Sequence, residues 1–360
     1  MKPTSLLLNN KPYSYEQIKT GDYTTGTEFE ARTLTFCSQW LNGQDTFEQK
    51  TSGSTGLPKP IKIYRKQMLV SAQQTVEVLN LKPNDVALVC VDSAFIAGKM
   101  MLVRAFEHQM KMIIVEPTST PFEGIETAIS FVAMIPLQLQ NTLLNPATKE
   151  KINDCKAVII GGAPVSAHLA SLIAKISTPI YSTYGMTETV SHIALKKLSN
   201  PPQNFYSTIG NIALSLNENN QLIINGAITS NKEIVTNDRV QLLSPTTFVW
   251  LGRTDNTINS GGVKIQIEEV EASISLLFER LNIDNRFFLD AEKDDTLGQK
   301  IVLYIEGFER TLPSTLMEKL KIQLEKYECP KNIYYIPKFD ETSTGKINRR
   351  SCVEKGRWLK

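Results

Sequence analysis

The sequence has few of the features that mark a zinc protein, a disulfide-stabilised protein or a membrane protein. Its five cysteines are scattered over 360 residues and never form a Cys-x-x-Cys pair. That spacing argues against a zinc site and a disulfide framework, and it fits a reducing compartment. No apolar run approaches the length that spans a bilayer, and the leucines near the N-terminus are too few for a signal peptide. We therefore expect no membrane span and a cytoplasmic location.

Neither sign of charge is in excess. Lys and Arg number 39 and Asp and Glu 37, for a net charge of +2. This balance argues against nucleic acid or an anionic membrane as the main partner. A hydrophobic content of 41% and a charged content of 21% are typical of a globular protein. The length favours one large and one small domain.

A Walker A loop is also missing from the stretch that most resembles a phosphate-binding loop, residues 51–60. Gly53 and Gly56 are too close together for that motif, and Lys59 follows a Leu-Pro pair. The glycines still allow backbone N–H groups to approach an anion, and hydroxyls and a lysine surround them. Residues 61–65 alternate apolar and polar side chains, which predicts a strand. We interpret the stretch as a lid over phosphates, with a Ser/Gly-rich surface turn as the alternative.

Four short apolar runs predict the centre of the fold. They predict strands that are covered on both faces at residues 86–91, 111–115, 131–135 and 157–160. Helix-like stretches precede or separate them. The sequence therefore predicts a largely parallel α/β domain with helices on both faces of the sheet.

Two polar motifs follow predicted strands. Gly161-Gly-Ala-Pro164 leaves the last apolar run, where α/β sheets bind ligands and where a flat ring could approach the backbone. A plain strand-to-helix turn capped by Ser166 is the alternative. The second motif, Tyr181-Ser-Thr-Tyr-Gly-Met-Thr-Glu-Thr189, offers a ring for stacking and a carboxylate for magnesium. Its Thr-Glu pair would otherwise be read as the start of a helix.

Beyond residue 200 the pattern changes to short alternating runs, which predict a small antiparallel β unit. Asp238 is expected on one of its turns, where it could accept hydrogen bonds from ribose hydroxyls or cap the turn. Gly252-Arg253 and the pair Gly261-Gly262 indicate a domain boundary, and residues 266–360 predict an α+β unit. Near its end, Lys346 stands on a glycine turn, as solvated surface lysines often do.

Four stretches stand in order along the chain, at residues 51–60, 181–189, 252–265 and 343–350. Together they resemble the adenylate-forming superfamily of acyl-CoA synthetases, peptide-synthetase adenylation domains and luciferases. The resemblance covers roughly residues 47–352. It implies that a carboxylate attacks the α-phosphate of ATP to give an acyl-adenylate and pyrophosphate. A thiol, typically that of coenzyme A, then displaces AMP. ATP, Mg²⁺ and coenzyme A are the implied cofactor and co-substrates.

The resemblance also implies a role for individual residues. The phosphate clamp would comprise Thr51, Ser52, Gly53, Ser54, Thr55, Gly56 and Lys59, and the adenine-facing turn Gly161, Gly162 and Ala163. Tyr184 would stack on adenine beside Gly185, Thr187 would contact the α-phosphate, and Glu188 would bind magnesium. The remaining matches are Asp238 for ribose, Arg253 for the nucleotide, Asp255 for a hinge, Gly261 and Gly262 for the pantetheine arm, and Lys346 for catalysis. At Asp238 the family usually has Thr-Gly-Asp, whereas this chain has Thr-Asn-Asp.

The phosphate loop starts far earlier here than in most of the family, which implies a shortened N-terminal subdomain. The implied organisation is a large domain over residues 1–252, a hinge at 253–257 and a small mobile α+β domain over 258–360. This compact form resembles o-succinylbenzoate–CoA ligases of menaquinone biosynthesis, with Phe95 and His192 as guesses for lining the acid pocket. An enzyme that loads a carrier protein and a non-catalytic nucleotide binder are the alternatives. The oligomeric state stays open, a homodimer included.

Overall fold

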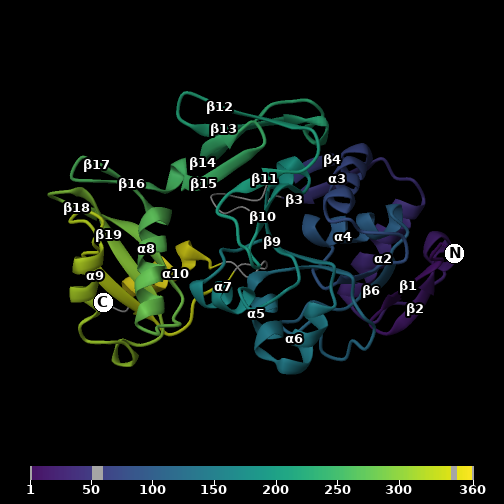
Figure 1. Ribbon diagram of the computed structural model, residues 1–360, viewed down its shortest axis with the longest axis horizontal. Coiled ribbons are helices and arrows are strands. Elements are labelled where there is room, and N and C mark those ends of the chain that lie inside the picture. The colour runs from purple at the N-terminus through teal and green to yellow at the C-terminus, as the bar shows by residue number, and fades with distance from the viewer. Residues whose placement is uncertain (1, 51–59, 342–346, 359–360) are drawn as a thin grey trace.

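The structure is a computed structural model that describes residues 2–50, 60–341 and 347–358. A large unit holds the N-terminus and a small unit holds the C-terminus, and the two lie side by side (Figure 1). The large unit is built on one sheet in the order β12-β13-β14-β15-β11-β10-β9-β8-β7-β5-β6-β1-β2. Its strands are β1 Ser5–Leu8, β2 Lys11–Ser14, β5 Val86–Val89, β6 Lys111–Ile114, β7 Phe131–Met134, β8 Ala157–Ile160, β9 Ile180–Gly185, β10 His192–Lys197, β11 Tyr206–Thr208, β12 Ile212–Leu216, β13 Gln221–Gly226, β14 Ile234–Ser244 and β15 Thr247–Arg253.

The central strands are parallel and buried on both faces, as the sequence predicts. The pairs β1·β6, β5·β6, β5·β7, β7·β8 and β8·β9 are parallel, whereas the strands from β9 to β15 pair antiparallel. Ala87 and Val89 belong to one core cluster, while Leu88 and Cys90 belong to another on the opposite face. This alternation is the two-residue period of a strand. The predicted α/β fold class is confirmed.

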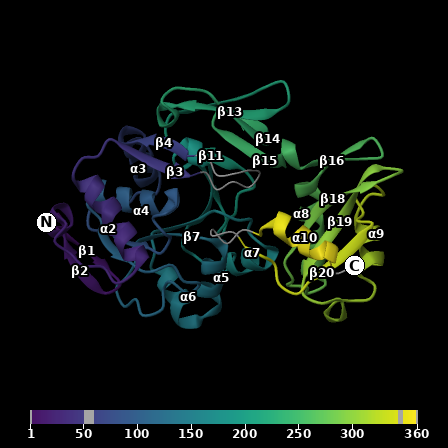
Figure 2. The same cartoon turned by 180° about the vertical axis from the view of Figure 1, so that it is seen from behind.

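Helices cover both faces of the parallel part of the sheet. One face carries α2 Glu28–Leu41, α3 Arg65–Val78 and α4 Ile96–Glu107, and the other carries α5 Pro136–Leu144, α6 Pro146–Asn153 and α7 Ala167–Ile173. The short helix α1 Tyr15–Thr20 packs against α2. A separate hairpin, β3 Thr46–Lys50 with β4 Pro60–Tyr64, flanks residues 51–59. Turning the molecule shows the same layers from behind (Figure 2).

The strands beyond residue 200 pair antiparallel, as the sequence predicts, and β11–β15 continue the large sheet through β10. One expectation about this region needs correction. Asp238 lies within β14 and not on a turn. Its register partner is Arg253 of β15, and the pairing shifts between Arg239 and Val240. The run Thr236-Asn-Asp-Arg239 is composed of residues that favour turns, and pairing with β15 overrides that local preference.

The small unit is an α+β layer with its own core. Its strands are β16 Thr257–Ser260, β17 Val263–Gln266, β18 Phe287–Asp294, β19 Gly298–Glu306 and β20 Asn332–Ile336. Helices α8 Ile267–Arg280 and α9 Leu316–Gln323 cover one face, and α10 Arg349–Trp358 packs against β20 on the other. Helix α9 begins three residues after Pro313.

All five cysteines are free and buried, and burial raises the pKa of each thiol. Within the described residues, no helix combines the length and the apolar character that crossing a membrane requires.

Candidate active site

The carboxyl ends of β8 and β9 form the floor of the candidate nucleotide site. Gly161, Gly162 and Ala163 leave β8, and β9 runs parallel beside it, with Ile160 opposite Ser182. Thr183 donates a hydrogen bond to the Ile160 carbonyl (3.2 Å), and a Cβ at Gly161 would overlap the Thr183 hydroxyl. A side chain at Gly161 would therefore displace the Thr183 hydroxyl from this bond. The predicted adenine-facing turn and the tyrosine motif thus meet at one edge of the sheet.

Asp238 lies beside Tyr184 and accepts two hydrogen bonds from aromatic donors. The Tyr184 hydroxyl donates to Asp238 Oδ2 at 2.7 Å, and Trp250 Nε1 donates to Oδ1 at 3.1 Å. Asp238 is only 6% exposed. Each carboxylate oxygen has a further lone pair, so the two donors orient the group without using up its capacity for ribose hydroxyls.

The ring of Tyr184 is held in an aromatic cluster. It lies 5.0 Å from Phe248 in an edge-to-face contact and 5.8 Å from Tyr206, which itself stacks on Phe248. Burial, reinforced by the nearby Asp238 carboxylate, raises the pKa of Tyr184, so its hydroxyl stays protonated as a donor. The cluster fixes the ring that the sequence assigns to adenine.

Thr187 and Glu188 belong to a single 3-10 turn, Thr187–Thr189, directly after β9. β10 crosses so close to Gly185 that a Cβ there would overlap the Ser191 and His192 backbone. Val190 closes the turn with a φ of 65°, a strained value for a β-branched residue. Glu188 is exposed, and within the described residues no group of three or more His, Cys, Asp or Glu side chains could hold a metal. A single carboxylate still fits Mg²⁺, which takes its other ligands from water and substrate phosphates.

Arg253 and Asp255 form an ion pair at the junction of the two units. Arg253 Nε and Nη2 donate to the two carboxylate oxygens at 2.8 and 2.7 Å. This hydrogen bonding lowers the pKa of Asp255. Arg253 ends β15 opposite Asp238, so the predicted hinge residue is connected to the candidate ribose site. Motion about residues 253–257 remains a prediction.

Gly261 and Gly262 are not brought to this site. Gly261 and Gly262, with φ values of 61° and 85°, form the two-residue turn of the β16–β17 hairpin, where both positions need positive φ. Both views show that hairpin on the side of the small unit away from β9 (Figures 1 and 2). The phosphate-loop residues Thr51–Gly56 and Lys59, and Lys346, lie outside the described residues.

A buried polar cluster lies next to the tyrosine motif and includes His192. Arg104 Nη2 donates to Ser191 Oγ at 2.8 Å, and Ser191 Oγ lies 3.4 Å from His192 Nδ1. On the other side of the ring, His192 Nε2 lies 3.2 Å from Thr75 Oγ1, whose proton goes to the Ser71 carbonyl. Thr75 must therefore accept from Nε2–H, and Ser191 donates to Nδ1. Burial lowers the pKa of His192 well below 6.5, so the imidazole is neutral.

Arg104 is a buried cation without an acidic partner. It is 1% exposed, no carboxylate of the described residues pairs with it, and the undescribed segments contain no Asp or Glu. Its Nε is one of three buried side-chain atoms that lack a hydrogen-bond partner in the described structure; the others are Ser71 Oγ and Gln74 Oε1. Burial lowers the pKa of Arg104 to about 9, which leaves it charged at neutral pH. A buried charge of this kind is costly unless an anion joins it.

Arg104 was not among the residues predicted from the sequence, although its apolar neighbours indicate burial. It stands between Met100-Met-Leu-Val103 and Ala105-Phe106, in a helix that is otherwise buried there. Phe95, the other guess for the acid pocket, is half-buried and begins the same helix. Nine residues separate it from Arg104, or about 13 Å along the axis. The structure thus places Phe95 and His192 at different ends of α4.

The fold and the strand-end geometry define an α/β protein with a candidate nucleotide site at the ends of β8 and β9, and with a buried cation, Arg104, bonded to Ser191 beyond the tyrosine motif. A family model described as AMP-binding enzyme matches residues 47–224. A solved structure of an acyl-CoA synthetase (AMP-forming)/AMP-acid ligase II-like protein from Dyadobacter fermentans is 41% identical, with a TM-score of 0.62 over 94% of this chain and 98% of its own. The chain belongs to this family of AMP-forming acyl-CoA synthetases and AMP-acid ligases.

More distant relatives carry a substrate in their names. A 2-succinylbenzoate–CoA ligase from Haemophilus influenzae is 25% identical over 86% of this chain and 70% of its own length. The o-succinylbenzoate coenzyme A synthetase (MenE) from Bacillus subtilis, solved in complex with ATP and magnesium ion, has a TM-score of 0.67. It is 18% identical and covers 84% of this chain and 68% of its own, so it is similar in fold.

Proposed function

We propose that this chain is an ATP-dependent acid–CoA ligase that acts on an aromatic dicarboxylic acid, with o-succinylbenzoate as the leading candidate. In the first step a carboxylate oxygen attacks the α-phosphorus of ATP and pyrophosphate leaves, which gives an acyl-adenylate. In the second step the thiol of coenzyme A loses its proton and attacks the acyl carbon, and AMP leaves. The product is an acyl-CoA thioester.

The proposal of a dicarboxylic substrate rests on the burial of Arg104 without an acidic partner among the described residues. One carboxyl of the substrate must react with ATP, so a buried cation away from the nucleotide turn suits a second carboxylate. Its unpartnered Nε and its Nη2 lie on one edge of the guanidinium, the edge that pairs with both oxygens of a carboxylate. The neutral His192 beside it adds no competing charge. The names of the 2-succinylbenzoate–CoA ligase relatives agree with a substrate of two carboxylates.

The nucleotide half of the proposal rests on the β8 and β9 strand ends. Tyr184 would bind adenine, Asp238 would accept the ribose hydroxyls, and Thr187 would contact the α-phosphate. Glu188 would hold Mg²⁺, which supplies charge neutralisation for the phosphates when it is bound. From the family motif, Lys346 would bridge the carboxylate and the α-phosphate, and residues 51–59 would clamp the outer phosphates. Coenzyme A is the proposed acceptor, and the cytoplasm the proposed location.

The test compares o-succinylbenzoate with two acids that each lack one carboxyl, 4-oxo-4-phenylbutanoate and 2-butanoylbenzoate. Pyrophosphate release from ATP and Mg²⁺ is measured with and without coenzyme A, and the thioester is identified by mass. We expect the diacid to be the best substrate. Replacing Arg104 with methionine should lower kcat/KM for the diacid by about 10²- to 10³-fold, because an ion pair to a buried charge is lost.

The monoacids supply the control. The monoacid that keeps the reacting carboxyl should be a poor substrate. Its kcat/KM should change little in Arg104→Met, because it has no second carboxylate for Arg104 to bind. An equal loss for diacid and monoacid would contradict a carboxylate-binding role for Arg104. No pyrophosphate release with any acid, in protein that binds ATP, would contradict the ligase proposal itself.

A further inference from the structure

A chain of hydrogen bonds leads from Arg104 to the backbone of α3, and its direction is fixed. Arg104 donates to Ser191, and Ser191 donates to His192. The His192 Nε2–H donates in turn to Thr75, whose own proton goes to the Ser71 carbonyl at 2.9 Å. A carbonyl only accepts, so each group in the chain donates away from Arg104. The imidazole therefore carries its proton on Nε2 and accepts at Nδ1.

The backbone that carries Ser191 is held by two short hydrogen bonds. The Ser191 N–H donates to the Thr189 carbonyl at 2.6 Å, and the Thr189 hydroxyl donates to the Ser191 carbonyl at 2.7 Å. The same carbonyl lies so close to Gly185 that a Cβ there would overlap it. Ser191 is thus fixed by the turn that contains Thr187 and Glu188, the residues proposed for the α-phosphate and Mg²⁺.

The bond to Ser191 decides which hydrogens of Arg104 remain for a ligand. Nη2 carries two hydrogens, and Ser191 uses one of them. The other remains, together with the Nε–H, which has no partner among the described residues. An arginine side chain has many rotamers, so burial alone does not select the orientation of the guanidinium. A fixed acceptor on Nη2 does.

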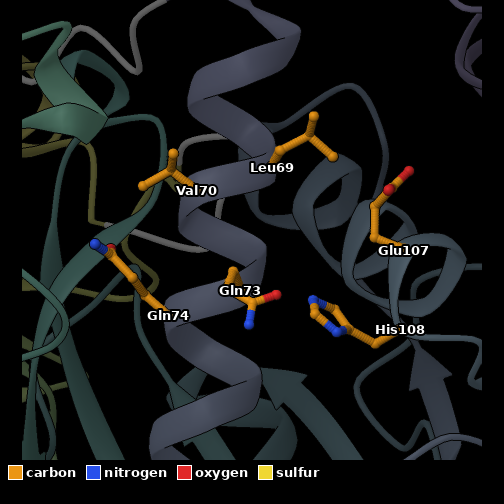
Figure 3. Close-up of a pocket in the computed structure, with 6 residues that line it drawn as sticks. All are labelled: Leu69, Val70, Gln73, Gln74, Glu107 and His108. Carbon is orange, nitrogen blue, oxygen red and sulfur yellow. The ribbon is translucent and has the colours of Figure 1, made fainter.

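The chain runs along the inner face of α3 only. Ser71 and Thr75 are both buried and lie one turn apart, so they share that face. On the outer side, Gln73 and His108 line an open cleft between α3 and the end of α4, and the Gln74 side chain points away from them across the helix (Figure 3). His108 is therefore separated from the chain by α3.

We propose that the side chains of this hydrogen-bond chain are positioning residues for Arg104, which hold its guanidinium so that the Nε edge meets the second carboxylate of the acid. They are Thr75, His192 and Ser191. The inference rests on the proposed acid–CoA ligase function. It assigns His192 a role other than lining the acid pocket, because the ring acts on the acid through Ser191 and Arg104. The chain then contributes to the choice of a diacid over a monoacid.

The first test compares o-succinylbenzoate with the monoacid that keeps the reacting carboxyl. Ser191→Ala should lower kcat/KM for the diacid by about tenfold, mainly through KM, because a hydrogen bond to a charged group is lost. The value for the monoacid should not change, whereas a purely structural defect would lower both. Ser191→Thr keeps the hydroxyl and should retain the preference for the diacid.

Thr75→Val tests the far end of the chain without a change next to Arg104. It should also lower kcat/KM for the diacid alone. The double variant with Ser191→Ala should lose no more than Ser191→Ala does, because both substitutions break one chain. Valine is close to threonine in shape, so Thr75→Val also serves if Ser191→Ala does not fold. His108→Gln is the matched control: it changes a histidine four residues beyond Arg104, on the outer cleft, and should keep the wild-type preference.

The tautomer of His192 is a second measurement, and it needs no acid. The sequence has three histidines, so NMR of isotope-labelled histidine gives few ring signals, and His192→Gln identifies the relevant one. We expect the neutral Nε2–H form in the wild type and the Nδ1–H form in Thr75→Val, where Nε2 loses its acceptor.

Three results would overturn this inference alone: a wild-type His192 that is protonated on Nδ1, equal losses for diacid and monoacid in an active enzyme, or additive losses in the double variant. Inactivity of the wild type with every acid would overturn the proposed function and, with it, the role assigned to the chain.

Discussion

Tyr184 of β9 donates a 2.7 Å hydrogen bond to Asp238 of β14, which joins two strands that lie 54 residues apart in the sequence. Three other strands, β15, β11 and β10, separate them in the order of the sheet. The bond therefore connects the end of the parallel region with its antiparallel extension. It sets the orientation of the carboxylate that we assign to ribose.

Tyr184→Phe should weaken ATP binding while it leaves the ring in place. Loss of a hydrogen bond to a charged group predicts an increase in the KM for ATP on the order of tenfold, with a smaller change in kcat. Acid-dependent pyrophosphate release measures both values. Tyr206→Phe is the control, because the Tyr206 hydroxyl bonds to Ser182 and not to Asp238. A KM for ATP that changes equally in the two variants would refute the assignment of Asp238 through Tyr184.

Arg104→Met should make the protein without substrate at least as stable as the wild type. The substitution removes a buried charge that has no acidic partner and replaces it with an apolar chain of similar length. A gain of about 1 kcal/mol would raise Tm by about 2–4 °C in a domain of this size. Thermal unfolding at neutral pH, followed by circular dichroism, measures the change. A marked fall in Tm would indicate that Arg104 serves to hold the fold together.

His192 should make the fold sensitive to mild acid. Its pKa lies well below 6.5 in the folded protein and at about 6.5 in the unfolded chain, so the unfolded chain binds the proton more readily. The stability that its neutral form provides is complete above pH 6.5 and is lost as the pH falls from 6.5 toward the folded pKa. His192→Gln should show a smaller fall in Tm between about pH 7.5 and 5.5 than the wild type.

A second variant separates the effect of the buried His192 from that of an exposed histidine. His168 is exposed on α7, and His168→Gln should retain the acid sensitivity of the wild type. If His192→Gln and the wild type lose the same Tm between the two pH values, the neutral His192 is not the cause.

Lys346→Ala should cripple adenylate formation and largely spare thioester formation from a preformed acyl-adenylate. A lysine has a compact charge that can reach the carboxylate and the α-phosphate together in the first step. The two half-reactions are measured separately, by pyrophosphate release and by transfer from synthetic acyl-adenylate to coenzyme A. Equal losses in both would contradict the assigned role.

Asp255→Pro should harm the second half-reaction more than the first. Asp255 lies in the 3-10 turn Thr254–Asn256 that joins the two sheets, and proline fixes its φ. Asp255→Ala is the control, because it removes the ion pair with Arg253 and leaves the backbone free to rotate. Undiminished thioester synthesis by the proline variant would exclude the hinge.

The strands that the sequence predicts best are those whose local pattern agrees with their place in the fold. The runs at 86–91, 131–135 and 157–160 are buried on both faces, so their apolar character alone marks them. The strand-end motifs were located for the same reason, since they directly follow such runs. The nucleotide contacts assigned to these motifs come from the family resemblance, and the experiments above test them.

The features that the sequence did not reveal depend on distant contacts. Asp238 was expected on a turn because Thr236-Asn-Asp-Arg239 is a polar run of turn-forming residues, whereas pairing with β15 holds it in a strand. The apolar residues on either side of Arg104 were a local signal of burial, but its hydrogen-bond partner Ser191 lies 87 residues away.

The burial of all five cysteines makes the folded chain a convenient carrier for optical probes. Because every native thiol is enclosed and its pKa is raised, a maleimide dye should react slowly with the folded protein. One new cysteine on an exposed position of α7 and another on α9 would then accept a donor and an acceptor dye. Energy transfer between them would report any rotation of the small unit during turnover, molecule by molecule.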